Sequence, residues 1–135
     1  GRLEPIIGSV NYWEGDRIGS GTPPILIYEG WLMLYHGSAS ANQRGQVGRY
    51  AAGAILLDRK HPSRVIARSR DPIMLPIRDF EKLGFVPNVV FPTSLLADGQ
   101  DFLVFYGAAD TSVAMARFSK RSVLDSLSPQ SEFQV

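Results

Sequence analysis

The chain has 135 residues, 44% of them hydrophobic, and a net charge of +1, which fits one domain with a packed core. This charge gives no electrostatic case for nucleic acid or an anionic membrane as a partner, and the arginines are scattered, as on a solvated surface. The absence of cysteine excludes disulfides and thiolate metal sites, and no apolar run approaches the roughly 20 residues needed to cross a membrane. We expect a soluble, cytoplasmic protein.

The first half of the chain predicts a β-hairpin that ends in a histidine. Residues 1–16 suit an entry segment or a short edge strand, and residues 17–24 read as a glycine- and proline-rich loop. Apolar runs then flank Glu29-Gly30, which is a typical hairpin turn. A flexible loop of small, polar residues is expected at 37–48. The strands expected in this half cover residues 25–28, 31–35, 50–57 and 64–69.

The second half predicts another hairpin and the one convincing helix. Residues 79–84 suit a single helical turn, and a second hairpin turns at Asp98-Gly99. Its strands are expected at 89–96 and 102–106, followed by a strand at 111–118 and a helix at 120–127. In the strand at 111–118, alternation places Val113, Met115 and Arg117 on one face and Ala114, Ala116 and Phe118 on the other. Residues 128–135 carry no pattern.

An internal repeat is the main clue to the architecture. The stretch from Pro24 to Gly37 resembles the stretch from Pro92 to Gly107, about 70 residues further along. Such a period, built from short strands and hairpin turns, favours an all-β propeller over the competing two-sheet sandwich. We predict one partial β-propeller domain, residues 1–135, with blade-like repeats at about 13–70 and 85–127 and a short C-terminal helix.

The predicted repeats are too few to close a ring. Propellers have about 4–8 blades, whereas this length supplies roughly two to two and a half. An open arc leaves exposed strand edges, which are prone to pairing with other chains. We therefore expect either a longer protein or copies that assemble into a homo-oligomer.

A few polar residues are candidates for chemistry. His36 ends the first hairpin, where it is either a buried structural histidine or a site residue, and His61 lies in a surface turn. Two histidines so far apart do not make a metal site. Arg17, on a glycine-rich loop, suits an anion through charge-assisted hydrogen bonds. Asp110 follows small residues at a strand end, where it accepts sugar hydroxyls or caps the next strand. No pair of carboxylates has a spacing that identifies a glycosidase acid and base.

Five motifs together resemble one enzyme family. In the same order and with similar spacing, they are similar to the β-mannoside phosphorylases of glycoside hydrolase family 130. The similarity runs from about Trp13 to Leu127, nearly the whole chain. The motifs are Ile18–Ile25, Glu29–Gly37, Gly53–Asp58, Val89–Pro92 and Tyr106–Asp110.

The resemblance implies a fold and a reaction. It implies a five-bladed β-propeller with its sugar site at the central channel, in which a mannose-containing oligosaccharide is cleaved with inversion. Inorganic phosphate is the co-substrate in most members, some relatives are hydrolases, and no metal or organic cofactor is implied. A carboxylic acid assists departure of the glycosidic oxygen while phosphate attacks the opposite face, so phosphate replaces the activated water of an inverting hydrolase.

Four residues match functional positions of the family. By position, Arg17 and His36 match phosphate-binding residues, and Asp110 matches a carboxylate that binds mannosyl hydroxyls. Tyr50 matches a substrate-lining tyrosine, although Ala51 stands where the family usually has arginine. The family's proton-donating aspartate and further phosphate-binding arginines lie in a first half to which no part of this sequence corresponds. No catalytic residue is therefore assigned here.

Two functions from different classes follow. In the first, the chain is the C-terminal portion of such a glycosidase and contributes phosphate and mannose contacts, so whether it is an enzyme by itself stays open. In the second, it is a non-catalytic module that binds carbohydrate or phosphate and self-associates to cover its blade edges.

Overall fold

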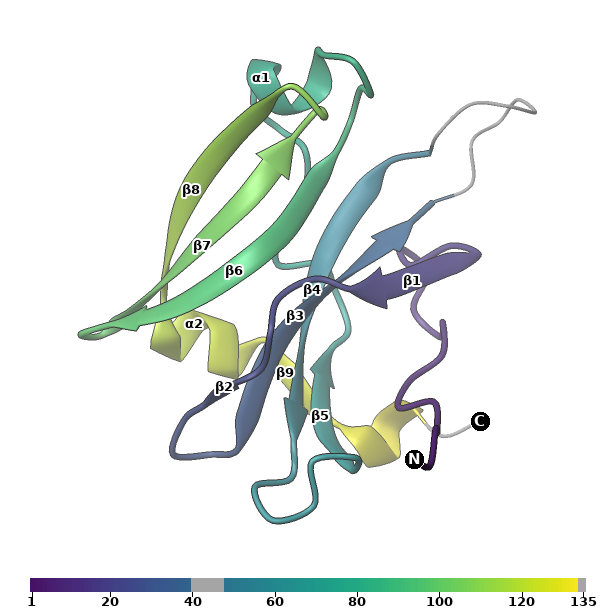
Figure 1. The fold of residues 1–135 in the computed structure, drawn as a ribbon, viewed down its shortest axis with the longest axis vertical. Coiled ribbons are helices and arrows are strands. Elements are labelled where there is room, and N and C mark those ends of the chain that lie inside the picture. The colour runs from purple at the N-terminus through teal and green to yellow at the C-terminus, as the bar shows by residue number, and fades with distance from the viewer. Residues whose placement is uncertain (40–47, 134–135) are drawn as a thin grey trace.

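The computed structural model describes residues 1–39 and 48–133, which form two antiparallel β-sheets that lean against each other in an open V (Figure 1). Most strands that are neighbours in a sheet are also consecutive in the sequence. The described strands do not close into a ring. Sheet A contains β1 (Arg17–Ser20), β2 (Ile25–Leu26), β3 (Trp31–Ser38), β4 (Tyr50–Leu57), β5 (Val65–Ser69) and β9 (Leu127–Pro129). Sheet B contains β6 (Val90–Asp98), β7 (Asp101–Ala108) and β8 (Ser112–Ser119). The helices are α1 (Asp79–Lys82), α2 (Lys120–Asp125) and the 3₁₀ helix η1 (Gln130–Phe133).

Sheet A has the order β1-β3-β4-β5-β9, and β2 pairs with the other end of β3. The predicted loop at 17–24 is partly wrong, because its first four residues form β1 along β3. Only residues 21–24 leave the strand. There the amides of Gly21 and Thr22 both donate to the Leu34 carbonyl at 3.0 Å, and the Thr22 hydroxyl accepts the Leu34 amide. These bonds hold the proline-rich segment against β3, so β1 and β2 act as one interrupted strand.

Sheet B has the order β6-β7-β8 and two tight turns. Gly99 (φ +57°) forms the β6–β7 turn, as the Asp98-Gly99 signal predicts. Ala109 and Asp110 both have positive φ values, +47° and +51°, in the β7–β8 turn. The predicted faces of β8 are confirmed, because Val113 and Met115 are exposed while the alternate residues Ala114, Ala116 and Phe118 pack against the core.

The main core lies between the two sheets. Alternate residues of β3 and β4 face alternate residues of β6 and β7, and α2 closes one end with Val123. A second cluster covers the opposite face of sheet A, where Trp13 and Tyr35 are 1% exposed. The two clusters together explain why β4, a continuous apolar run, is buried on both faces.

The ends of the elements differ from some predictions. The predicted loop at 37–48 is wrong in its first two residues, which belong to β3, and residues 40–47 lie outside the described part of the chain. The predicted helix at 120–127 stops at Asp125, because the chain then returns to pair β9 with β5 in sheet A. The patternless end, residues 128–135, thus contributes to a strand and to η1 as far as it is described. Within the described ranges, no helix has the length and apolar character needed to span a bilayer.

Candidate functional site

A cavity of about 440 Å³ lies where the starts of β4 and β6 meet the β7–β8 turn. This volume falls within the range of about 300–1,000 Å³ that is usual for small-molecule sites. Tyr50 and Asp110, both predicted to contact substrate, line this cavity from sheet A and sheet B respectively. The remaining walls are formed by Val86, Val89, Phe91, Thr93 and Gly107.

The Asp110 carboxylate is presented by a rigid turn. Thr111 donates its amide to the Ala108 carbonyl at 3.0 Å, and the Ala109 amide donates to the Val89 carbonyl at 3.0 Å. Among the described residues, no hydrogen bond or ion pair engages the exposed Asp110 side chain. The alternative role, a carboxylate that caps β8, therefore has no hydrogen bond to support it, and the side chain is available to a ligand.

His36 lies behind the cavity wall. Its ring centroid is 4.4 Å from that of Phe91 and 5.5 Å from that of Tyr50. Burial lowers the pKa of His36 below its ordinary value, and a hydrogen bond with the Ser20 main chain opposes this only in part. The imidazole is thus neutral at neutral pH. Its buried Nδ1 atom has no hydrogen-bond partner among the described residues.

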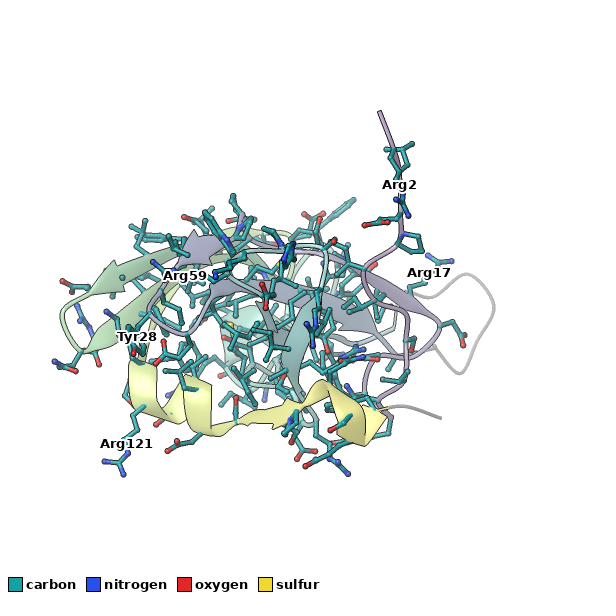
Figure 2. The ribbon with its side chains drawn as sticks, turned by 90° about the horizontal axis from the view of Figure 1, so that it is seen from below. Arg2, Arg17, Tyr28, Arg59 and Arg121 are labelled. Carbon is teal, nitrogen blue, oxygen red and sulfur yellow. The ribbon has the colours of Figure 1, made fainter. Side chains whose placement is uncertain are left out.

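Arg17 lies on the same sheet face as His36 but at the outer edge. Strand pairing places Arg17 opposite Ser38, and Ser38 opposite Tyr50, so these three side chains form a row across one face of sheet A. His36, paired with Gly19, is in the next row of the same face. Diagonal neighbours of this kind are about 7–8 Å apart, within reach of a long side chain. Arg17 is exposed at the periphery of the molecule, beside the N-terminal segment (Figure 2).

The structure thus groups three predicted residues and leaves one at the margin. Tyr50 and Asp110 share the cavity, His36 stacks against its Tyr50 and Phe91 walls, and Arg17 projects from the edge strand. Sequence reasoning missed Phe91, although it lies within the Val89–Pro92 motif. The aromatic ring in that motif was the signal that could have found it.

One arginine contradicts the expectation of a scattered, solvated set. Arg68 is 1% exposed, and its Nη2 atom is 2.5 Å from Oε1 of Glu14, which is fully buried. The pair lies on the face of sheet A that carries Trp13 and Tyr35, away from the cavity. The prediction failed because the partners are 54 residues apart and no local pattern marks either one. Within the described residues, no cluster of three or more histidine or acidic side chains is arranged to hold a metal ion.

The sequence is similar to a set of mannoside phosphorylases. It matches the family model described as beta-1,4-mannooligosaccharide phosphorylase over residues 1–128. It is 38% identical over 121 residues to a 1,2-beta-oligomannan phosphorylase of Thermoanaerobacter sp. (strain X514), covering 89% of this chain and 39% of the relative. It is 35% identical over 127 residues to a beta-1,4-mannooligosaccharide phosphorylase of Ruminococcus albus, covering 93% of this chain and 37% of the relative.

Solved structures give the same result. The beta-1,2-mannobiose phosphorylase from Listeria innocua, in complex with beta-1,2-mannobiose, superposes with a TM-score of 0.76 and 38% identity, covering 84% of this chain and 31% of that one. A second neighbour, from work on mannoside phosphorylases and on hydrolases of beta-1,2 linkages in Candida mannan, gives a TM-score of 0.75 and 30% identity, covering 90% and 35%. These neighbours are propeller-like. The chain therefore spans less than two fifths of the length of the relatives that it matches.

Proposed function

This chain belongs to glycoside hydrolase family 130, and we propose that it is the C-terminal portion of a β-mannoside phosphorylase, two to two and a half blades of a five-bladed propeller. The observation that carries the proposal is the family match across residues 1–128, in which Tyr50 and Asp110, both predicted to contact substrate, line one cavity. In this proposal the cavity takes a mannosyl residue, and the phosphate co-substrate lies toward His36 and Arg17. No metal or organic cofactor takes part.

The proposed reaction is inverting phosphorolysis. A phosphate oxygen forms a bond to the anomeric carbon while the bond to the glycosidic oxygen breaks on the opposite face, and a carboxylic acid delivers a proton to the leaving oxygen. The residues of this chain bind and orient. Asp110 accepts hydrogen bonds from mannosyl hydroxyls, Tyr50 lines the sugar site, and Arg17 and His36 contact the phosphate. The proton donor comes from a part of the protein outside this chain.

Binding of ligands by this chain tests the proposal. Calorimetry with beta-1,2-mannobiose should show binding that is weakened roughly 10- to 100-fold by Asp110→Asn, because the variant loses charged hydrogen bonds of about 1.5–3 kcal/mol. Asp79→Asn is the matched control, since its exposed carboxylate lies on α1 and does not line the cavity. Arg17→Ala should weaken binding of inorganic phosphate and leave mannobiose binding unchanged. Equal affinity of Asp110→Asn and the unchanged chain would contradict the assignment.

Turnover assays test whether this chain carries the catalytic acid. We expect no cleavage of mannobiose by this chain alone, with or without phosphate, because the acid is assigned to another part of the protein. Robust turnover would show that the chain carries an acid of its own, and its dependence on phosphate would separate phosphorolysis from hydrolysis. None of the relatives named above is described as a non-catalytic binding module, so we do not propose the alternative function.

A further inference from the structure

Each of the two hairpins is joined to the segment before it by a buried pair, formed by a glutamate of that segment and a tyrosine of the hairpin. At the second hairpin, the Tyr106 hydroxyl donates to Oε1 of Glu81 at 2.6 Å. The other carboxylate oxygen, Oε2, accepts the amides of Ile77 and Arg78, each at 2.8 Å. Glu81 is 5% exposed and Tyr106 is 4% exposed. We call these two residues the Glu81–Tyr106 pair.

The first hairpin has the same arrangement. The Tyr35 hydroxyl donates to Oε1 of Glu14 at 2.5 Å, and Oε2 accepts the amides of Val10 and Asn11 at 2.7 and 2.9 Å. At both hairpins the glutamate thus binds the amides three and four residues before it and a tyrosine of the second strand of the hairpin. We call these two residues the Glu14–Tyr35 pair. The recurrence indicates a common device that attaches the segment before each hairpin to the hairpin itself.

The two pairs differ in what they support. The Glu81 carbonyl accepts the Val89 amide at 3.1 Å, and Val89 lines the cavity. Val89 in turn accepts the amide of Ala109, next to Asp110, while the Ala109 carbonyl accepts the amide of Val86, another wall residue. The Glu14–Tyr35 pair lies on the opposite face of sheet A, among the cluster around Trp13. The Glu81–Tyr106 pair is therefore linked to the walls of the cavity by a continuous set of hydrogen bonds through Val89 and Ala109.

We propose that Glu81 and Tyr106 are positioning residues of the cavity, which hold the wall at residues 86–89 and thereby the turn that presents Asp110. The inference rests on the proposed function for the identity of the ligand, a β-mannoside. Neither side chain is assigned a contact with that ligand, since neither lines the cavity. Their effect is transmitted through the main chain of Val89 and Ala109.

The protonation states suit this role. Burial opposes ionisation of Glu81, but the hydrogen bonds from Tyr106 and from the amides of Arg78 and Ile77 outweigh it and lower the pKa of the carboxyl group. Burial and the bond to Glu81 raise the pKa of the Tyr106 hydroxyl. At neutral pH the glutamate is thus an anion that accepts three hydrogen bonds, and the tyrosine keeps its proton.

The test compares Tyr106→Phe with Tyr35→Phe in the full chain. Each removes one hydroxyl from a buried pair, but only Tyr106→Phe is expected to weaken binding of beta-1,2-mannobiose, by about fivefold or more, the loss of one oriented hydrogen bond. Tyr35→Phe should leave the affinity within about twofold, although both variants lose stability in urea. Equal affinities in the two variants would overturn the inference.

A second measurement is independent of the ligand. Hydrogen exchange by NMR should be faster at the amides of Val86, Val89 and Ala109 in Tyr106→Phe than in Tyr35→Phe when both are compared at equal global stability. Unchanged exchange at these three amides would refute the positioning role, whether or not the chain binds mannobiose. Absence of mannobiose binding, by contrast, would count only against the proposed function. Glu81→Gln, which keeps the shape of the side chain, provides the same comparison should Tyr106→Phe not fold.

Discussion

Replacing Glu14 with glutamine is expected to remove a large part of the stability of this chain. Glu14 is fully buried, and its Oε1 atom accepts hydrogen bonds from Tyr35, from Arg68 and from the side chain of Asn11. Its Oε2 atom accepts two main-chain amides. A glutamine at this position presents an NH₂ group to one of these two sets of donors, whichever way the amide is turned.

The size of the effect follows from the charge that is left behind. Arg68 stays buried and protonated, and removing one partner of a buried ion pair costs about 3–5 kcal/mol. Domains of this kind have a total free energy of unfolding of about 5–15 kcal/mol, so the loss is a substantial fraction. Adding Arg68→Met to Glu14→Gln should recover part of the loss, because it removes the unpaired buried charge while the glutamine still accepts one set of the remaining hydrogen bonds.

Urea denaturation followed by tryptophan fluorescence measures the change. Trp13 is adjacent to the substitution, and its ring centroid is 5.4 Å from that of Tyr35, so it reports on this cluster. Glu132→Gln is the control, because it breaks an exposed ion pair with Arg70 and should cost no more than about 1 kcal/mol. A loss below about 1 kcal/mol in Glu14→Gln would refute the reasoning, since the buried charge would then have found water or another partner.

Three further substitutions test the packing and the titration. Gly53→Ala should lower the free energy of unfolding by about 1–3 kcal/mol, because a Cβ atom there would lie 2.7 Å from both Ser69 Oγ and the Trp13 ring. Gly107→Ala is the control: its Cβ would have no atom nearer than 3.9 Å, so the thermal midpoint should stay unchanged or rise. Burial lowers the pKa of His36, so the unfolded chain binds this proton more readily than the folded one. The free energy of unfolding should therefore fall as the pH drops below 6.5, the ordinary pKa of histidine, and His36→Gln should flatten that part of the profile; a wild-type profile that is already flat there would contradict the burial argument.

The strands and their turns could be predicted because their signals are local. The run at 50–57 is apolar throughout and became β4 with the expected bounds, and the signals at Glu29-Gly30 and Asp98-Gly99 mark real hairpins. The internal repeat stays a prediction, which rests on residues that keep their spacing along the chain. Patterns of this kind report on a few neighbouring residues, which is the range over which alternation and turn chemistry act.

The features that were missed depend on residues far apart in the sequence. β9 pairs with β5 across about 60 residues, as in the pair Ser69 and Leu127. No pattern in the last residues of the sequence predicts this strand. The buried state of Arg68 depends on Glu14, and the cavity depends on how the two sheets lean together. A family resemblance can name Tyr50 and Asp110, but only the packing of the sheets shows that they share one space.

The site arises where the two repeats use the same position differently. In sheet A the cross-strand pair is Gly19 with His36, and in sheet B the equivalent pair is Phe91 with Gly107. A Cβ on Gly19 would lie 2.7 Å from the His36 ring, so the glycine makes room for that ring, and Gly107 likewise leaves space beside Phe91. The large residue is on the second strand in one repeat and on the first strand in the other. Because of this exchange, the His36 and Phe91 rings stack between the sheets with their centroids 4.4 Å apart. The space beside Gly107 stays open and forms part of the cavity.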